Sequence, residues 1–213
     1  EPTLLFPSGK TYVITGSSNF LASEGRLGVK EGIKTITHDN VTVIATGAEF
    51  LVPASYHYAR TSTIGEDGND HFAQGFKVMG RNFKMIGGFV NGNLENRTIV
   101  TPTVGTGEDF GLWIGESAFN AHVQGVNFSG WGSDSCYVHS QGVFEDCIFE
   151  KGRRLGVAVT SKFEVTKNKP VIFRRCIFRN NSTPYLTVDS PAEAPASGID
   201  LECNGFTGPI HAE

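Results

Sequence analysis

Two carboxylates, Asp200 and Glu202, stand two residues apart in the stretch Gly198-Ile-Asp-Leu-Glu202. Apolar and acidic residues alternate here with the period of a β-strand, so both carboxylates would lie on one face. Residues two apart on a strand are about 6.6–6.8 Å apart, inside the roughly 6.5–9.5 Å carboxylate separation of inverting glycosidases. Like charges at that distance raise the pKa of one carboxyl, which would place an acid beside a base. The pair predicts glycoside hydrolysis, with ordinary solvated surface carboxylates as the alternative.

The strand that carries this pair belongs to a repeat. Three similar runs end in phenylalanine, at Phe128, Phe149 and Phe178, and a second β-type run follows each after a short turn. The first runs cover 121–128, 142–149 and 171–178, and the second cover 135–139, 156–160 and 198–202, with an earlier relative at 111–115. Short strands that recur in this way, joined by Gly, Asn and Ser turns, are typical of a solenoid of stacked coils. We expect 123–128, 143–149 and 172–178 to form one parallel sheet with the phenylalanines inside, and the second runs to form another.

The strand period assigns an inner and an outer face to the second runs. The inner residues would be Leu112, Ile114, Cys136, Val138, Val157, Val159, Ile199 and Leu201. One outer column would be Lys77, Trp113, Tyr137, Ala158 and Asp200, and its neighbour Met79, Gly115, His139, Thr160 and Glu202. Coils stack about 4.8 Å apart, so Trp113 to Asp200 spans about 14 Å, roughly three sugar residues.

Outward aromatic rings at Trp113 and Tyr137 favour a binding role, because sugar rings stack well on such faces. We expect these two rings, with Lys77 and His139, to bind an oligosaccharide beside the carboxylates. Asp134, Arg153 and Arg154 form a second candidate set at the turns. They would either bind an acidic sugar or pair with each other across the coils.

Other polar residues are interpreted as structural. Acidic residues of one coil face basic residues of the next, which predicts ion pairs between coils. The acidic residues are Glu145, Asp146 and Glu150, and the basic ones are Arg174, Arg175 and Arg179. Cys147 and Cys176 occupy one place in two copies of the repeat and are expected to stack as free core thiols, with a disulfide as the alternative. The four cysteines form no CxxC pair and the six histidines are scattered, so no metal or other cofactor is predicted.

Composition limits the function classes. The 213 residues are 39% hydrophobic and 11% aromatic, enough to bury one core, so we expect a single domain over 1–213. The net charge of -4 without a basic cluster argues against nucleic acid or an anionic membrane as a partner. No stretch has the length of a membrane span, so no membrane insertion is expected. Polar stretches at 53–73, 161–169 and 181–197 are predicted to project as side loops that wall a groove.

Three segments carry a family resemblance. The opening Leu4-Leu-Phe-Pro-Ser-Gly-Lys-Thr-Tyr-Val-Ile14, the run at 152–159 and the run at 196–202 resemble coils of the pectate-lyase-like superfamily, most closely those of bacteriophage tailspike and appendage domains. The resemblance implies an all-β, right-handed, single-stranded parallel β-helix with side loops. It also implies a homotrimer at a virion surface or in the extracellular space, and a polysaccharide as the partner.

The resemblance leaves the activity open, because the fold hosts lyases, hydrolases, epimerases and binding shafts. The expectation is a glycoside hydrolase that degrades a bacterial surface polysaccharide. A non-catalytic receptor-binding or structural shaft is one alternative. The other is a secreted polysaccharide lyase or epimerase, for which Tyr137, His139 and Lys77 are available as bases. The family's amino-terminal capping helix and later coils have no counterpart here, so the chain is expected to be a piece of a longer protein, or one whose ends are covered by something else.

Overall fold

The computed structural model describes residues 2–14, 17–18, 30–31, 35–54, 74–97, 109–160, 170–181, 197–202 and 210–212. Within these ranges the regular secondary structure is strand, apart from the short 3-10 helix η2 (Leu94–Asn96). No helix in this part of the chain is long and apolar enough to cross a membrane. The side loops predicted at 53–73, 161–169 and 181–197 lie outside the described residues except at their ends.

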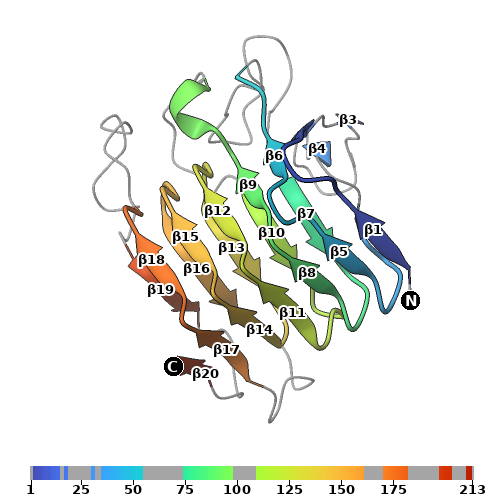
Figure 1. Ribbon diagram of the computed structural model, residues 1–213. Coiled ribbons are helices and arrows are strands. Elements are labelled where there is room, and N and C mark those ends of the chain that lie inside the picture. Colours follow the sequence, from blue (N-terminus) through green and yellow to red (C-terminus); the bar gives the residue numbers. More distant parts are fainter. Residues whose placement is uncertain are drawn as a thin grey trace.

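Three sheets, each built from one strand per coil, make up the body (Figure 1). The seven-stranded sheet contains β1 (Thr3–Leu5), β5 (Thr42–Ile44), β8 (Lys84–Ile86), β11 (Ala121–Gln124), β14 (Gly142–Glu145), β17 (Val171–Arg174) and β20 (Ile210–Ala212). The six-stranded sheet contains β2 (Thr11–Val13), β6 (Glu49–Leu51), β9 (Phe89–Asn91), β12 (Asn127–Ser129), β15 (Ile148–Glu150) and β18 (Ile177–Arg179). The five-stranded sheet contains β7 (Gln74–Val78), β10 (Phe110–Ile114), β13 (Asp134–Val138), β16 (Leu155–Thr160) and β19 (Ser197–Glu202).

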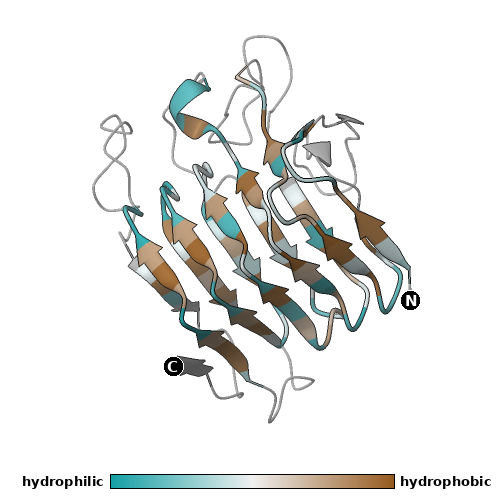
Figure 2. Ribbon diagram, in the orientation of Figure 1, coloured by the Kyte–Doolittle hydropathy of each residue, from teal (hydrophilic) through white to brown (hydrophobic). Residues whose placement is uncertain are grey.

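All pairings within these three sheets are parallel, which confirms the all-β parallel β-helix. Among the described strands, one antiparallel pair joins β3 (Ser17–Ser18) to β4 (Lys30–Glu31). The coils succeed one another from the blue end of the chain to the red end in Figure 1. Figure 2 shows hydrophobic residues gathered in the strands and hydrophilic ones in the turns between them.

The first runs of the repeat are not single strands, so that prediction was wrong. Each run divides into two strands that belong to different sheets, as β11 and β12 do. The corner residues Gly125, Asp146 and Arg175 have φ values of 65°, 54° and 51°, in the left-handed region. One residue in that conformation turns the chain from the seven-stranded to the six-stranded sheet. Glycine is the usual signal for this conformation in a sequence. Two of the three corners carry Asp or Arg instead, so the sequence does not mark the corner.

The core is built from phenylalanine ladders. Phe128, Phe149 and Phe178 stack along the six-stranded sheet, with ring centroids 5.5 and 5.1 Å apart and planes within 11° of parallel. Phe144 and Phe173 stack in the same way along the seven-stranded sheet at 5.1 Å. Phe128 and Phe149 are fully buried and Phe178 packs against the core, so the predicted inward orientation is confirmed.

Ion pairs connect the last coils as predicted. Glu145 lies 3.2 Å from Arg174, Asp146 lies 2.7 Å from Arg175, and Glu150 lies 2.7 Å from Arg179. The Asp146 and Arg175 side chains make two hydrogen bonds, of 2.7 and 3.0 Å, at the corner itself. Two of these pairs join residues in register on adjacent strands, and the third joins the corner residues of adjacent coils. The pairs therefore help to align the coils.

The two repeat cysteines stack on consecutive coils as free thiols, which confirms that prediction. They directly precede the register partners Ile148 and Ile177. A hydrogen bond with Cys176, together with burial, holds the pKa of the Cys147 thiol far above its ordinary value. Cys147 is therefore a protonated core residue.

Candidate functional site

The candidate column lies on the five-stranded sheet with the predicted register. Trp113 pairs with Lys77 on one side and with Tyr137 on the other. Tyr137 pairs with Ala158, and Ala158 with Asp200. The opposite face of these strands is buried as expected at Leu112, Ile114, Cys136, Val138, Val157 and Val159. The strand period therefore assigned both faces correctly.

Three side chains gather on the outer face around Trp113. The Lys77 ammonium nitrogen lies 4.5 Å from the Trp113 ring centroid. The Tyr137 ring meets Trp113 edge to face at 6.3 Å. The His139 ring lies 5.6 Å from Trp113 and 4.5 Å from Tyr137. Sequence analysis placed these residues in two neighbouring columns, and the structure brings them into one cluster.

Phe110 completes the cluster and was missed in the sequence. Its ring stacks on Tyr137 at 5.0 Å with planes 20° apart. Strict alternation would turn Phe110 inward with Leu112, but Gly111 faces inward instead, where an added Cβ would lie 3.0 Å from the Phe128 ring. The pairing of β10 with β7 accordingly skips Gly111. The signal in the sequence was the glycine that recurs here, at Gly75, Gly111, Gly156 and Gly198.

The outer face of this sheet is less open than the alternation alone implied. Trp113, Tyr137 and His139 are half-buried, and Ala158 is fully buried although its neighbours in the column are not. The Trp113 indole nitrogen is buried and has no hydrogen-bond acceptor among the described residues. Burying such a donor without an acceptor costs free energy.

The carboxylate pair lies at the far end of the column. Asp200 pairs with Ala158 and Glu202 with Thr160, so both belong to β19 and stand two residues apart on it. The Asp200 side chain is half-buried. For Glu202 the structure gives the position on β19, and its side chain is not described. Two coils separate Asp200 from Tyr137, or about 10 Å.

Asp134 and Arg154 pair across the coils, which is the second of the two alternatives for this set. Asp134 is fully buried, and its two carboxylate oxygens accept hydrogen bonds of 2.9 and 2.7 Å from Arg154. Arg153 is only 3% exposed and donates from Nε to the Gly132 carbonyl at 2.7 Å. Neither Asp134 nor Arg153 faces solvent, so we leave this set out of the proposed site.

A second buried ion pair positions the aromatic cluster. Arg97 and Asp109 have fully buried side chains 2.9 Å apart. Asp109 also accepts a 2.7 Å hydrogen bond from the Gly132 amide, and Arg97 donates to the Gly92 carbonyl at 3.1 Å. Because Asp109 directly precedes Phe110, this network holds the start of β10. Sequence analysis missed it, since nothing local marks two residues 12 apart as partners.

Comparisons with known proteins find no match, whether with family models, curated proteins or solved structures. The parallel β-helix and the arrangement of residues on its faces therefore rest on the structure alone.

Proposed function

We propose that the outer face of the five-stranded sheet binds a polysaccharide, which Asp200 and Glu202 hydrolyse. The observation that carries the proposal is the pair Trp113 and Tyr137, register partners on consecutive coils that keep half-exposed rings on an outward face. An aromatic ring left partly in water on a sheet that has a complete core offers a stacking surface to a ligand. Sugar rings present C–H faces of the matching kind.

The neighbours of the two rings support this role. Phe110 backs the Tyr137 ring and Lys77 lies over Trp113, so both rings are held in place before a ligand arrives. Preorganisation of this kind lowers the entropy cost of binding.

The carboxylates would act as the acid and base of an inverting glycosidase. One protonated carboxyl gives its proton to the glycosidic oxygen as the bond to the anomeric carbon breaks. The ionised carboxylate takes a proton from a water molecule whose oxygen forms the new bond to that carbon. The spacing of Asp200 and Glu202 on β19 is compatible with this arrangement.

A non-catalytic receptor-binding shaft is the second candidate, and the buried Ala158 favours it. Ala158 stands between Tyr137 and Asp200 and is closed to solvent, so the aromatic and acidic ends of the column are not one continuous exposed strip. Under either candidate the chain would serve as a tailspike-like or appendage-like domain at a virion surface or in the extracellular space. A polysaccharide lyase remains the alternative among enzymes.

The deciding experiment incubates the protein with a panel of bacterial capsular and cell-wall polysaccharides. New reducing ends without the absorbance of an unsaturated product identify a hydrolase, and both signals together identify a lyase. Retention of a polysaccharide on the immobilised protein without either signal identifies the binding shaft. Absence of both binding and cleavage across the panel would overturn the proposal.

A further inference from the structure

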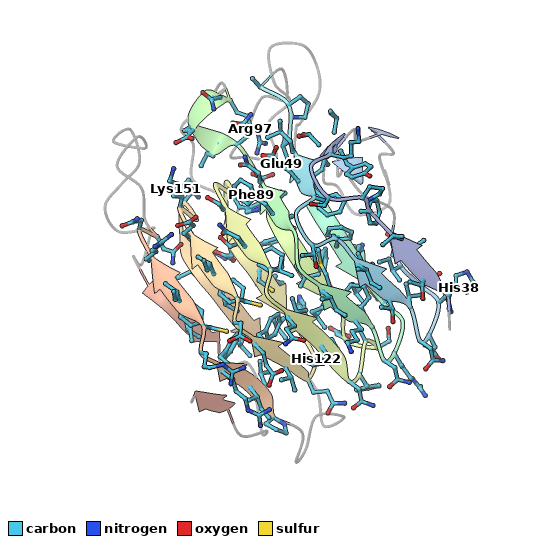
Figure 3. All side chains as sticks on the ribbon, in the orientation of Figure 1. His38, Glu49, Phe89, Arg97, His122 and Lys151 are labelled. Carbon is cyan, nitrogen blue, oxygen red and sulfur yellow. The ribbon has the colours of Figure 1, made fainter. Side chains whose placement is uncertain are left out.

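A cavity of about 260 Å³ lies on a different face, the outer side of the seven-stranded sheet. Its lining comes from β11, β14 and β17 and the turns that lead into them, namely Asn120, Ala121, His122, Gln141, Gly142, Val143, Pro170 and Ile172. Figure 3 labels His122 at the lower end of the molecule, whereas Arg97 lies at the upper end beside η2. None of these lining residues belongs to the proposed polysaccharide face.

The floor of the cavity is aliphatic. Val143 and Ile172 are register partners on consecutive coils, and both point outward and are half-buried. Pro170 precedes β17 and adds a third apolar surface. Side chains of this kind on an outward face form a strip that prefers C–H groups to water.

The Gln141 side chain lies at one edge of the cavity. It ends a ladder of hydrogen-bonded side-chain amides that runs along the turns of successive coils. Asn40, Asn82 and Asn120 have φ values of 61°, 55° and 59° and occupy equivalent turns. Asn82 donates to Asn40 at 2.9 Å, Asn120 donates to Asn82 at 3.0 Å, and Gln141 donates to Asn120 at 2.7 Å.

The ladder ends at Gln141 because Pro170 occupies the equivalent place in the next coil and has no amide side chain. The Gln141 side-chain oxygen therefore accepts no hydrogen bond from any described residue. It is a free acceptor beside an apolar floor.

The His122 imidazole lies at the opposite edge of the cavity, and Glu145 fixes its orientation. His122 Nε2 lies 3.0 Å from Glu145 Oε2, and Glu145 also binds Arg174 at 3.2 Å. The hydrogen bonds from His122 and then Arg174 lower the pKa of Glu145, so it stays ionised and can only accept. Nε2 of His122 therefore donates to Glu145, and Nδ1 is the ring nitrogen left for a ligand.

We propose that this cavity binds a single neutral pyranose unit. Such a ring combines an apolar C–H face with hydroxyl groups at its edge, which match the floor, the Gln141 oxygen and His122 Nδ1. Among the described residues no Lys, Arg, Asp or Glu lines the cavity, although Lys84, Glu145 and Arg174 flank it on neighbouring strand positions. Its volume lies just below the roughly 300 Å³ at which pockets for larger ligands begin, so it suits one ring rather than a chain.

The test is a titration of isotope-labelled wild-type protein with the methyl α-glycosides of glucose, galactose and mannose, followed by NMR. We expect saturable shifts, with a millimolar dissociation constant, at the amides of Ala121, His122 and Gly142 and the methyl groups of Val143 and Ile172. Absence of saturable shifts at these groups with all three sugars would overturn the proposal. Shifts confined to the five-stranded sheet would overturn it too, and would assign the sugar to the other face.

Two matched substitutions separate this site from the polysaccharide face. Val143→Arg fills the cavity and should abolish the shifts, whereas Ile44→Arg, at an outward half-buried position of the same sheet away from the cavity, should leave them. Ile172→Ala is the substitution that should disturb the fold least. It should weaken binding by about fivefold, since about 1 kcal/mol of apolar contact is lost. Trp113→Ala should leave this titration unchanged, so either proposal can fail while the other stands.

Discussion

Lys77 and Trp113 are register partners on neighbouring coils, and the lysine ammonium lies 4.5 Å from the indole ring centroid. No carboxylate pairs with Lys77 among the described residues, so the ring is the partner that holds the ammonium in place. Attraction between the cation and the ring face is worth about 0.5–1 kcal/mol at an exposed site. The contact orients the indole on the outer face, which is where the proposed polysaccharide would stack.

Replacing Trp113 with alanine should weaken polysaccharide binding while leaving the fold stable. The stacking contact is worth about 0.5–1.5 kcal/mol beyond the area it covers, so affinity should fall by up to about tenfold from this contribution. Isothermal titration with the polysaccharide identified in the panel measures the change. Phe89→Ala, which removes a half-buried outward ring from the six-stranded sheet, is the control and should bind normally. Equal affinity of the Trp113 variant and the wild type would exclude the stacking role.

Replacing Asp200 with asparagine, or Glu202 with glutamine, should abolish turnover and leave binding largely intact. Each change preserves the shape of the side chain and removes the ionisable group that transfers a proton. Reducing-end formation and binding are measured on the same preparations. Glu95→Gln removes an exposed carboxylate that pairs with Lys151, and should not change the rate. Full activity in both variants would remove the two carboxylates as catalytic residues.

Replacing Arg97 with alanine should destabilise the protein by about 3–5 kcal/mol, because it removes the guanidinium that lies 2.9 Å from the fully buried Asp109 carboxylate. Arg175→Ala breaks an exposed ion pair with Asp146 and should cost only about 0–1 kcal/mol. Chemical denaturation of the two variants measures both free energies of unfolding. Similar losses in the two variants would show that burial does not set the strength of the Arg97 pair.

Stability should fall in acid partly through Glu145. Hydrogen bonds from His122 and Arg174 lower its pKa in the folded protein from the ordinary 4.5. Its stabilising contribution is therefore complete above pH 4.5 and is lost as the pH falls through the lower folded-state pKa. The Glu145→Gln variant should show a shallower loss of unfolding free energy over that range than the wild type. Parallel curves for the two proteins would contradict the prediction.

A longer parent chain or a homotrimer is also expected, the trimer from the likeness of some segments to tailspike coils. Leu4, Leu5 and Val13 of the first coil are exposed apolar side chains, and β1 and β2 are edge strands of their sheets. Such edges and apolar surfaces favour association. Light scattering should give three times the mass of the chain. A stable monomer that unfolds cooperatively and reversibly would contradict the trimer.

The sequence was sufficient to assign the inner face and the register of the five-stranded sheet. Alternation placed Leu112 and Val157 inside and put Trp113, Tyr137 and Asp200 in one column, and the register confirms each. The ion pairs between coils followed because equivalent positions of adjacent repeats must stack. These features depend on local alternation and on repetition, and both can be read directly from the sequence.

Tertiary structure alone decided the features that depend on one backbone conformation or on an irregular coil. The left-handed corner at Asp146 divides an apparently continuous strand, and the inward Gly111 turns Phe110 outward against Tyr137. Partners in the asparagine ladder are 42, 38 and 21 residues apart, so no fixed period brings Gln141 beside the cavity that His122 also lines. Contacts between coils of unequal length exist only once the chain has folded, because stacking in space, and not separation in sequence, determines which residues meet.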